Sequence, residues 1–161
     1  MSIFIGIGSN LRTAYGRPKD TCISCINLLS KTGLRINYIS SFWYSKAVPL
    51  KVGPSFINAV VEVKTFLNPI ELLNLLHVIE AKMGRKRRIN SLARKIDIDI
   101  IDFNGCIMTN NICLPHPRMH KRLFVLRPLF ELSPYWRHPV TGIRIDSLLA
   151  NIYEDQITYP I

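Results

Sequence analysis

Asp97 and Asp99 stand two residues apart in a strand-forming run, and this pair is the clearest candidate for chemistry in the sequence. Successive side chains of a strand alternate between its two faces, so both carboxylates share one face and the intervening isoleucines share the other. Adjacent like charges repel unless a cation, a basic partner or a proton offsets them. Magnesium binds through one or two carboxylates together with substrate phosphates. The pair therefore predicts a magnesium site with Asp97 and Asp99 as ligands.

The segment before these carboxylates is strongly cationic. Its seven basic residues are Lys82, Arg85, Lys86, Arg87, Arg88, Arg94 and Lys95. A basic run is often only a solvated face, but next to a carboxylate pair it indicates phosphate chemistry. The net charge of +10 also indicates attraction to anions, although charge alone does not separate a nucleotide from nucleic acid or a membrane surface.

Length and composition indicate one domain, residues 1–161, because 161 residues with 48% hydrophobic content can bury a single core. No apolar run approaches the roughly 20 residues that span a bilayer, and the first residues do not resemble a signal peptide. The four cysteines lack the paired spacing of a zinc site and are expected to be free thiols in a reducing compartment. We therefore expect a cytoplasmic protein.

The predicted elements follow from periodicity and from start and stop signals. Residues 3–8 alternate as a strand, and its glycines leave one face without bulk, so that another group can approach the backbone closely. A helix is expected from Pro18 to Gly33, and strands are expected over residues 34–44 and 56–66. Asn68 begins a second helix that ends at Gly84. The carboxylate strand follows, and an apolar helix is expected after the loop at residues 115–122.

The order strand, helix, strand, strand, helix, strand predicts an α+β fold, a ferredoxin-like sandwich with a mostly antiparallel sheet. Its helices are expected on one face, leaving an open active-site face. Phe56 and Asn58 point away from the apolar side of their strand, as Asp97 and Asp99 do. The fold would therefore gather an aromatic ring, an amide and two carboxylates on the open face.

Nearly the whole chain resembles the 6-hydroxymethyl-7,8-dihydropterin pyrophosphokinase family of folate biosynthesis. The resemblance rests on five stretches taken together: residues 5–11 (Ile-Gly-Ile-Gly-Ser-Asn-Leu), Ser40-Ser41-Phe42 with residues 56–60 (Phe-Ile-Asn-Ala-Val), Ile79-Glu80 through Gly84-Arg85, the Asp97/Asp99 strand, and residues 114–120 (Leu-Pro-His-Pro-Arg-Met-His).

The resemblance implies transfer of the pyrophosphoryl group of ATP to the hydroxymethyl group of the pterin, with release of AMP, and it implies two Mg²⁺ ions. Asp97 and Asp99 match the metal-binding carboxylates, and Arg85 and Arg94 match catalytic cations. The residues that match ATP-binding positions are Glu80, Arg87, Arg94, Ile100, His116 and Arg122. A guanidinium suits phosphate because its fork binds two oxygens at once.

The remaining matches concern the pterin. Phe56 and Phe124 match aromatic residues that stack on the ring, and the amide of Asn58 can donate and accept hydrogen bonds at the ring edge. The other positions implied for pterin binding are Gly8, Ser45, Lys46 and Val48. The implied partners are these two small molecules, with no nucleic acid and no membrane, and the protein is expected to be a monomer. No general base is assigned.

One segment departs from the family pattern. The family commonly has Arg-Trp-Gly-Pro-Arg-Thr before the carboxylate strand, whereas this chain has Arg94 and Lys95 after Ile89-Asn90-Ser91-Leu92-Ala93. In the family this region is part of a lid over ATP, so its closure is in question. Lys95 either shares the carboxylate face and pairs with Asp97, or lies before the regular strand and meets phosphate.

Two alternatives remain open. A small RNA-binding module would also use an open sheet with aromatic and basic residues. It is disfavoured because two carboxylates on that sheet would repel phosphate, and because the glycine-aromatic signature of such modules is missing. A degenerate family member that keeps the fold without turnover is the second alternative, and the altered segment before Arg94 motivates it.

Overall fold

The computed structural model describes residues 2–46, 53–85, 94–152 and 156–161. Val48, Arg87 and the altered segment 89–93, all named above, lie outside these described residues. The elements, in order, are β1 (Ile3–Ser9), α1 (Pro18–Ser30), β2 (Arg35–Ile39), β3 (Trp43–Ser45), β4 (Phe56–Lys64), α2 (Pro69–Lys82), β5 (Asp97–Phe103), a 3-10 turn (Met119–Lys121), α3 (Leu123–Leu132), α4 (Ile145–Ala150) and β6 (Thr158–Pro160).

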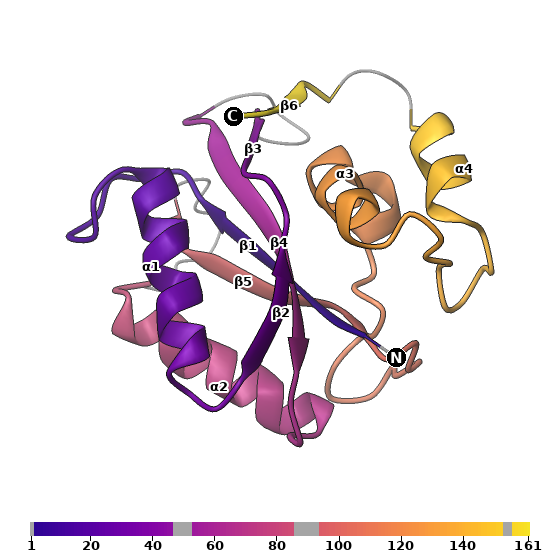
Figure 1. The fold of residues 1–161 in the computed structure, drawn as a ribbon, viewed down its shortest axis with the longest axis horizontal. Helices are drawn as coiled ribbons and strands as arrows, with labels where there is room; N and C mark the ends of the chain where they lie inside the picture. The colour runs from indigo at the N-terminus through magenta and orange to yellow at the C-terminus, as the bar shows by residue number, and fades with distance from the viewer. Residues whose placement is uncertain (1, 47–52, 86–93, 153–155) are drawn as a thin grey trace.

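An antiparallel sheet forms the centre of the molecule, in the order β5-β1-β4-β3-β6, with β2 also paired to β4 (Figure 1). The central strand β1 is antiparallel to both of its neighbours, β4 and β5. This sheet, with α1 and α2 as its connecting helices, confirms the predicted α+β fold. None of the helices in the described part of the chain is long and apolar enough to cross a membrane.

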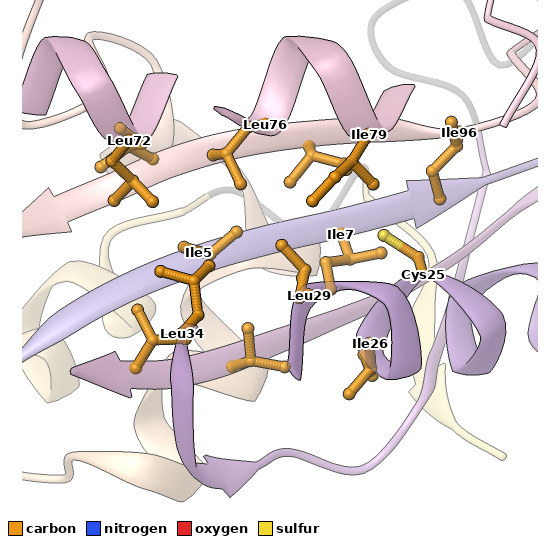
Figure 2. Close-up of a cluster of buried hydrophobic side chains, with 14 of the residues drawn as sticks. Ile5, Ile7, Cys25, Ile26, Leu29, Leu34, Leu72, Leu76, Ile79 and Ile96 are labelled. Carbon is orange, nitrogen blue, oxygen red and sulfur yellow. The ribbon is translucent and has the colours of Figure 1, made fainter. Parts of the chain in front are cut away.

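The main core lies between one face of the sheet and the helices α1 and α2. Leu72, Leu76 and Ile79 of α2 point toward Ile5 and Ile7 of β1, as Figure 2 shows. Both helices begin where their sequences predict. Asn68 accepts hydrogen bonds from the main-chain N–H groups of the first turn of α2, and proline occupies the first position of each helix.

The other face of the sheet is only partly open, because α3 packs against β4 and β3 on it (Figure 1). A second core cluster lies there, with Phe4, Val60 and Ile101 of the sheet against Leu126 and Leu129 of α3. The sequence predicted the helix but did not place it on this face. The part of the face that α3 leaves uncovered is the part that carries the candidate site.

The single strand predicted over residues 34–44 is wrong, because the chain breaks between β2 and β3. At the break, the Ser40 hydroxyl accepts a hydrogen bond from the Val60 N–H at 3.0 Å and donates one to the Ser41 carbonyl at 2.8 Å. The Ser41 N–H turns away from the sheet and donates to Glu131 of α3 at 2.7 Å. Side chains of serine that bond to nearby backbone compete with the regular ladder, and here they redirect the strand.

Candidate active site

Two glycines of β1 form the floor of the site. Gly8 is paired with Asn58 on one side and Asp97 on the other, and Gly6 is paired in the same way with Val60 and Asp99. Residues paired across an antiparallel sheet share a face, so Gly8 lies between the Asn58 amide of β4 and the Asp97 carboxylate of β5. The Ile101 side chain lies over Gly6, 3.0 Å from where a Cβ would stand. The sequence predicted that another group could approach the backbone of this strand closely, and the lack of a side chain at Gly8 leaves that approach open from the pocket.

A pocket opens over these glycines, between β4, β5 and the start of α3. Its lining includes residues predicted for three roles: for the pterin Gly8, Ser45, Lys46, Phe56, Asn58 and Phe124, for the metal Asp97 and Asp99, and for ATP Arg94 and Arg122. The sequence analysis missed the apolar part of the lining, which includes Gly6, Val60, Ile101 and Val125. Ile101 could have been found, because it has the same strand parity as the two carboxylates.

Asp97 lies between two guanidinium groups. Arg94 pairs with its Oδ2, and the Arg85 Nη1 lies 2.8 Å from its Oδ1. The same Arg85 Nη1 pairs with Glu80. Glu80 is only 2% exposed, and its Oε1 also accepts the Ile98 N–H at 2.8 Å. A buried carboxylate thus fixes Arg85, and Arg85 in turn fixes Asp97 at the edge of the pocket.

Asp99 is more open, with 44% of its side chain exposed, and the Nε2 of the His116 imidazole lies 3.9 Å from its Oδ2. Desolvation and the charge of Asp97 raise the pKa of Asp99 to about 6, while Arg122, Arg85 and Arg94 oppose that rise. The two carboxylates therefore repel each other, and a bound cation would offset that repulsion.

Arg122 lines the pocket beside the carboxylates, and His116 borders them just outside it. Burial, with the charges of Arg122 and Arg118, lowers the pKa of His116 to about 4, so this imidazole is neutral at neutral pH. Burial also lowers the pKa of Arg122. The Arg122 guanidinium carbon lies 5.4 Å from the centre of the Phe124 ring, which orders both side chains at the pocket wall.

The lowered pKa of His116 predicts a pH-dependent loss of stability. Between the ordinary histidine pKa of about 6.5 and the folded value of about 4, the unfolded chain binds a proton that the folded protein excludes. The contribution of His116 to the free energy of unfolding is therefore fully present above the ordinary pKa and is lost as the pH falls toward 4. We expect His116→Asn to lose less stability than the unchanged protein between pH 7 and pH 4.5. Parallel urea unfolding curves at the two pH values measure this difference, and equal losses would contradict it.

The pterin side of the pocket is built on β3 and β4. The Asn58 side chain is 6% exposed, and its Nδ2 donates to the Ser45 Oγ at 2.9 Å and to the Trp43 carbonyl at 3.4 Å. Those two contacts use the N–H donors of the amide. Among the described contacts, the acceptor Oδ1 is therefore the atom that can bind a ligand. The expected role, in which the amide donates and accepts at once toward the pterin, would require one of these donor contacts to be exchanged for the ligand.

Glu131 of α3 has a positioning role that the sequence did not indicate. Its Oε1 accepts the Trp43 indole N–H at 2.8 Å and its Oε2 accepts the Ser41 N–H, so α3 holds β3 at the wall of the pocket. Ser45 lies two residues beyond Trp43. No local pattern links residue 131 to residue 43, because the contact depends on where α3 packs.

Three described residues expected to bind ATP, Ile100, Glu80 and His116, do not line this pocket. The side chain of Ile100 lies in the main core against α2, and the carboxylate of Glu80 is buried under Arg85. His116 borders the carboxylates without lining the described pocket.

Lys95 lies before β5 and is exposed, and a Cβ added to Gly84 would lie 3.4 Å from its Nζ. That position matches the alternative in which Lys95 precedes the regular strand.

The Gly8 position should tolerate no larger side chain. A Cβ on Gly8 would lie 3.0 Å from the Asn58 Oδ1, closer than ordinary contact, and would occupy the floor of the pocket. We expect Gly8→Val to raise the KM for the pterin by at least about tenfold, the effect of roughly 1.4 kcal/mol of lost binding. Gly33→Ala, at a left-handed position with a φ of +86° far from the pocket, is the control for a glycine substitution that strains the backbone without filling the pocket. Steady-state kinetics with varied pterin measure the effect, and an unchanged KM would contradict it.

The donor set of the pocket fits magnesium. Within the described residues no group of three or more histidine, cysteine, aspartate or glutamate side chains could hold a metal alone. Asp97 and Asp99 supply two carboxylates toward one pocket, and magnesium typically takes its other ligands from water and from substrate phosphates. Such a site is complete only when a phosphorylated substrate is present.

An antiparallel sheet with a partly open face, a carboxylate pair and arginines beside one pocket fits an enzyme that acts on a nucleotide with magnesium. The sequence matches the family of 7,8-dihydro-6-hydroxymethylpterin-pyrophosphokinase (HPPK) over residues 4–134. The chain belongs to this family.

The relatives share about a third of their residues with this chain. The pyrophosphokinase of Bacillus subtilis is 36% identical over 157 residues, which is 95% of this chain and 90% of that protein. The folic acid synthesis protein fol1 of Pneumocystis carinii is also 36% identical, and there the chain spans 97% of its own length but 21% of the relative. The domain thus occurs both nearly alone and within much longer proteins.

Solved structures share the fold. An HPPK-DHPS crystallised with substrates superposes with a TM-score of 0.72 at 16% identity, over 92% of this chain and 43% of that one. The wild-type HPPK-DHPS of Plasmodium falciparum gives a TM-score of 0.71 at 16% identity, over 97% of this chain and 44% of that one.

Proposed function

We propose that this chain transfers the pyrophosphoryl group of ATP to the hydroxymethyl group of 6-hydroxymethyl-7,8-dihydropterin and releases AMP. The observation that carries the proposal is one pocket that joins an apolar and amide side to a carboxylate and arginine side. Family membership supports it independently. We further propose that residues 1–161 form one catalytic domain.

On the pterin side, Phe56 and Phe124 line the pocket and would stack on the ring, while the Asn58 Oδ1 would accept from its edge. Offset stacking of aromatic rings contributes about 0.5–1.5 kcal/mol beyond burial. Gly8 would let the ring lie close to the sheet. The hydroxymethyl group would then point along the floor toward Asp97 and Asp99.

On the phosphate side, Arg85, Arg94 and Arg122 would bind the triphosphate as bidentate donors. The pterin hydroxyl oxygen would form a bond to the β-phosphorus and release its proton to water, while the bond from that phosphorus to the oxygen bridging the α-phosphate breaks and AMP leaves. We propose that Asp97 and Asp99 hold two magnesium ions, which when bound neutralise phosphate charge and fix the in-line geometry. No side chain is assigned as base, because positioning and charge supply most of the rate in such reactions.

We also propose a monomer that acts in the cytoplasm on small molecules, without nucleic acid or membrane. All four cysteines lie in the described residues and all are free thiols, which agrees with a reducing compartment. The RNA-binding alternative gains no support, because both carboxylates line the pocket that a strand of RNA would have to enter.

Measurement of AMP release from ATP and magnesium, with and without 6-hydroxymethyl-7,8-dihydropterin, tests the proposal. AMP that depends on the pterin is the expected result, because AMP rather than ADP identifies pyrophosphoryl transfer. A folded protein that binds ATP but releases no AMP would favour the degenerate family member. Salt-sensitive RNA binding without magnesium would favour the binding module.

A further inference from the structure

Asn10 follows the central strand β1 and contacts the two sides of the site at once. Its Oδ1 accepts the Arg94 N–H at 2.6 Å, and its own N–H donates to the Arg94 carbonyl at 3.1 Å. Its Nδ2 donates to the Pro54 carbonyl at 3.2 Å. The residue is 5% exposed, so water competes little for these bonds.

The two contacts of Asn10 lead to different halves of the pocket. Arg94 precedes Asp97 by three residues and itself pairs with that carboxylate, so one contact leads to the phosphate side. Pro54 precedes Phe56 by two residues, so the other contact leads to the wall expected to stack on the pterin. Neither chain segment belongs to the sheet at these points, since β4 begins at Phe56 and β5 at Asp97.

We propose, on the basis of the function proposed above, that Asn10 is a positioning residue that couples nucleotide binding to pterin binding. Ordering of the Arg94 segment by the nucleotide also orders Asn10, and through its amide the Pro54 segment that leads to Phe56. The reverse follows necessarily, because a coupling free energy between two ligands is reciprocal. An amide suits this role because it is a donor and an acceptor in one side chain.

The neighbouring Ser9 provides a matched comparison. Its Oγ donates to the Lys95 carbonyl at 2.6 Å, and it is fully buried. The Ser9 backbone pairs with Ile57 of β4, but its side chain bonds to the phosphate-side segment, whereas the Asn10 side chain bonds to both segments. A substitution at Ser9 should change nucleotide affinity without changing the coupling between the two ligands.

Asn10→Asp separates the two contacts of the amide. The carboxylate keeps an acceptor for the Arg94 N–H but has no donor for the Pro54 carbonyl. The experiment measures the Kd of α,β-methylene-ATP with magnesium, with and without saturating 6-hydroxymethyl-7,8-dihydropterin, in the unchanged protein, Asn10→Asp and Ser9→Ala. The analogue cannot be cleaved at the reacting bond, so binding is read without turnover.

We expect the pterin to tighten analogue binding in the unchanged protein, and Asn10→Asp to reduce that tightening about three- to tenfold, as the loss of one hydrogen bond implies. Ser9→Ala should weaken analogue binding equally with and without pterin. The Tm of each variant is measured in parallel. Should Asn10→Asp fail to fold, Asn10→Ser with the same readout replaces it, since serine is too short to reach both segments.

The inference is overturned if the unchanged protein binds both ligands without coupling, or if Asn10→Asp and Ser9→Ala change the coupling equally. Either result leaves the proposed function intact, because that function is read from AMP release by the unchanged protein. An unchanged protein that couples both ligands through Asn10 but releases no AMP would overturn the proposed function alone.

Discussion

Asp99→Asn is expected to lower magnesium-dependent AMP release by about a thousandfold while the fold is retained. A metal that stabilises transition-state charge contributes several kcal/mol, and each 1.36 kcal/mol is a factor of ten in rate. The substitution removes one of the two carboxylates that face the pocket and keeps the size of the side chain. Because the pKa of Asp99 is raised in the folded protein, its charge does not stabilise the fold, and the Tm should not fall.

Asp97→Asn should lose turnover to a similar extent but should behave differently without substrates. Asp97 is the shared partner of Arg85 and Arg94, so its neutralisation leaves both guanidiniums less compensated. We expect a lower Tm and tighter binding of metal-free ATP in this variant than in Asp99→Asn.

The matched control is Asp146→Asn, at an exposed carboxylate of α4 that pairs with Arg144 away from the pocket. The three variants are compared by their turnover at several magnesium concentrations and by their ATP binding, measured by calorimetry. Full activity of either Asp97→Asn or Asp99→Asn would refute the metal assignment. Equal losses in all three variants would point to a general effect of charge.

The sequence predicted the shared face of the carboxylates because a strand has a period of two and the register of β1 with its neighbours follows from buried isoleucines. Ile98 and Ile100 are buried against the helices, so Asp97 and Asp99 had to face the other way. The glycines of β1 then indicated where the floor would be. These inferences depend on local alternation, which a single sequence contains.

The parts that were missed depend on tertiary placement. Glu131 reaches Trp43 only because α3 packs across β3 and β4, and the break between β2 and β3 depends on a contact between residues 41 and 131. In the same way, the donors of Asn58 are engaged by Ser45 and by the Trp43 carbonyl. No periodicity in one segment reports such contacts between distant segments.

Arg85→Ala is expected to lower kcat by about a thousandfold, within the range of 10³–10⁵ that a transition-state arginine contributes in related phosphoryl transfers. Without substrates, Arg85 is held by buried Glu80 and by Asp97 at 2.8 Å. With Asp97 engaged by the proposed magnesium, this guanidinium would be free to bind phosphate while Glu80 still orients it. Because the interaction strengthens as charge develops, kcat should fall more than the affinity for ATP.

Arg85→Lys should recover only a small part of the activity, because an ammonium cannot bridge Glu80 and a phosphate through a fixed fork. Lys82→Ala removes an equal charge from the exposed last turn of α2 and is the control for net charge.

Glu80→Gln keeps an acceptor for the Ile98 N–H but weakens the pairing with Arg85, so it should lower kcat by a smaller factor. Single-turnover and steady-state kinetics separate these effects. If Glu80→Gln were unchanged while Arg85→Ala lost activity, the orientation of Arg85 by Glu80 would be unnecessary. If both were fully active, Arg85 would have no part in the reaction.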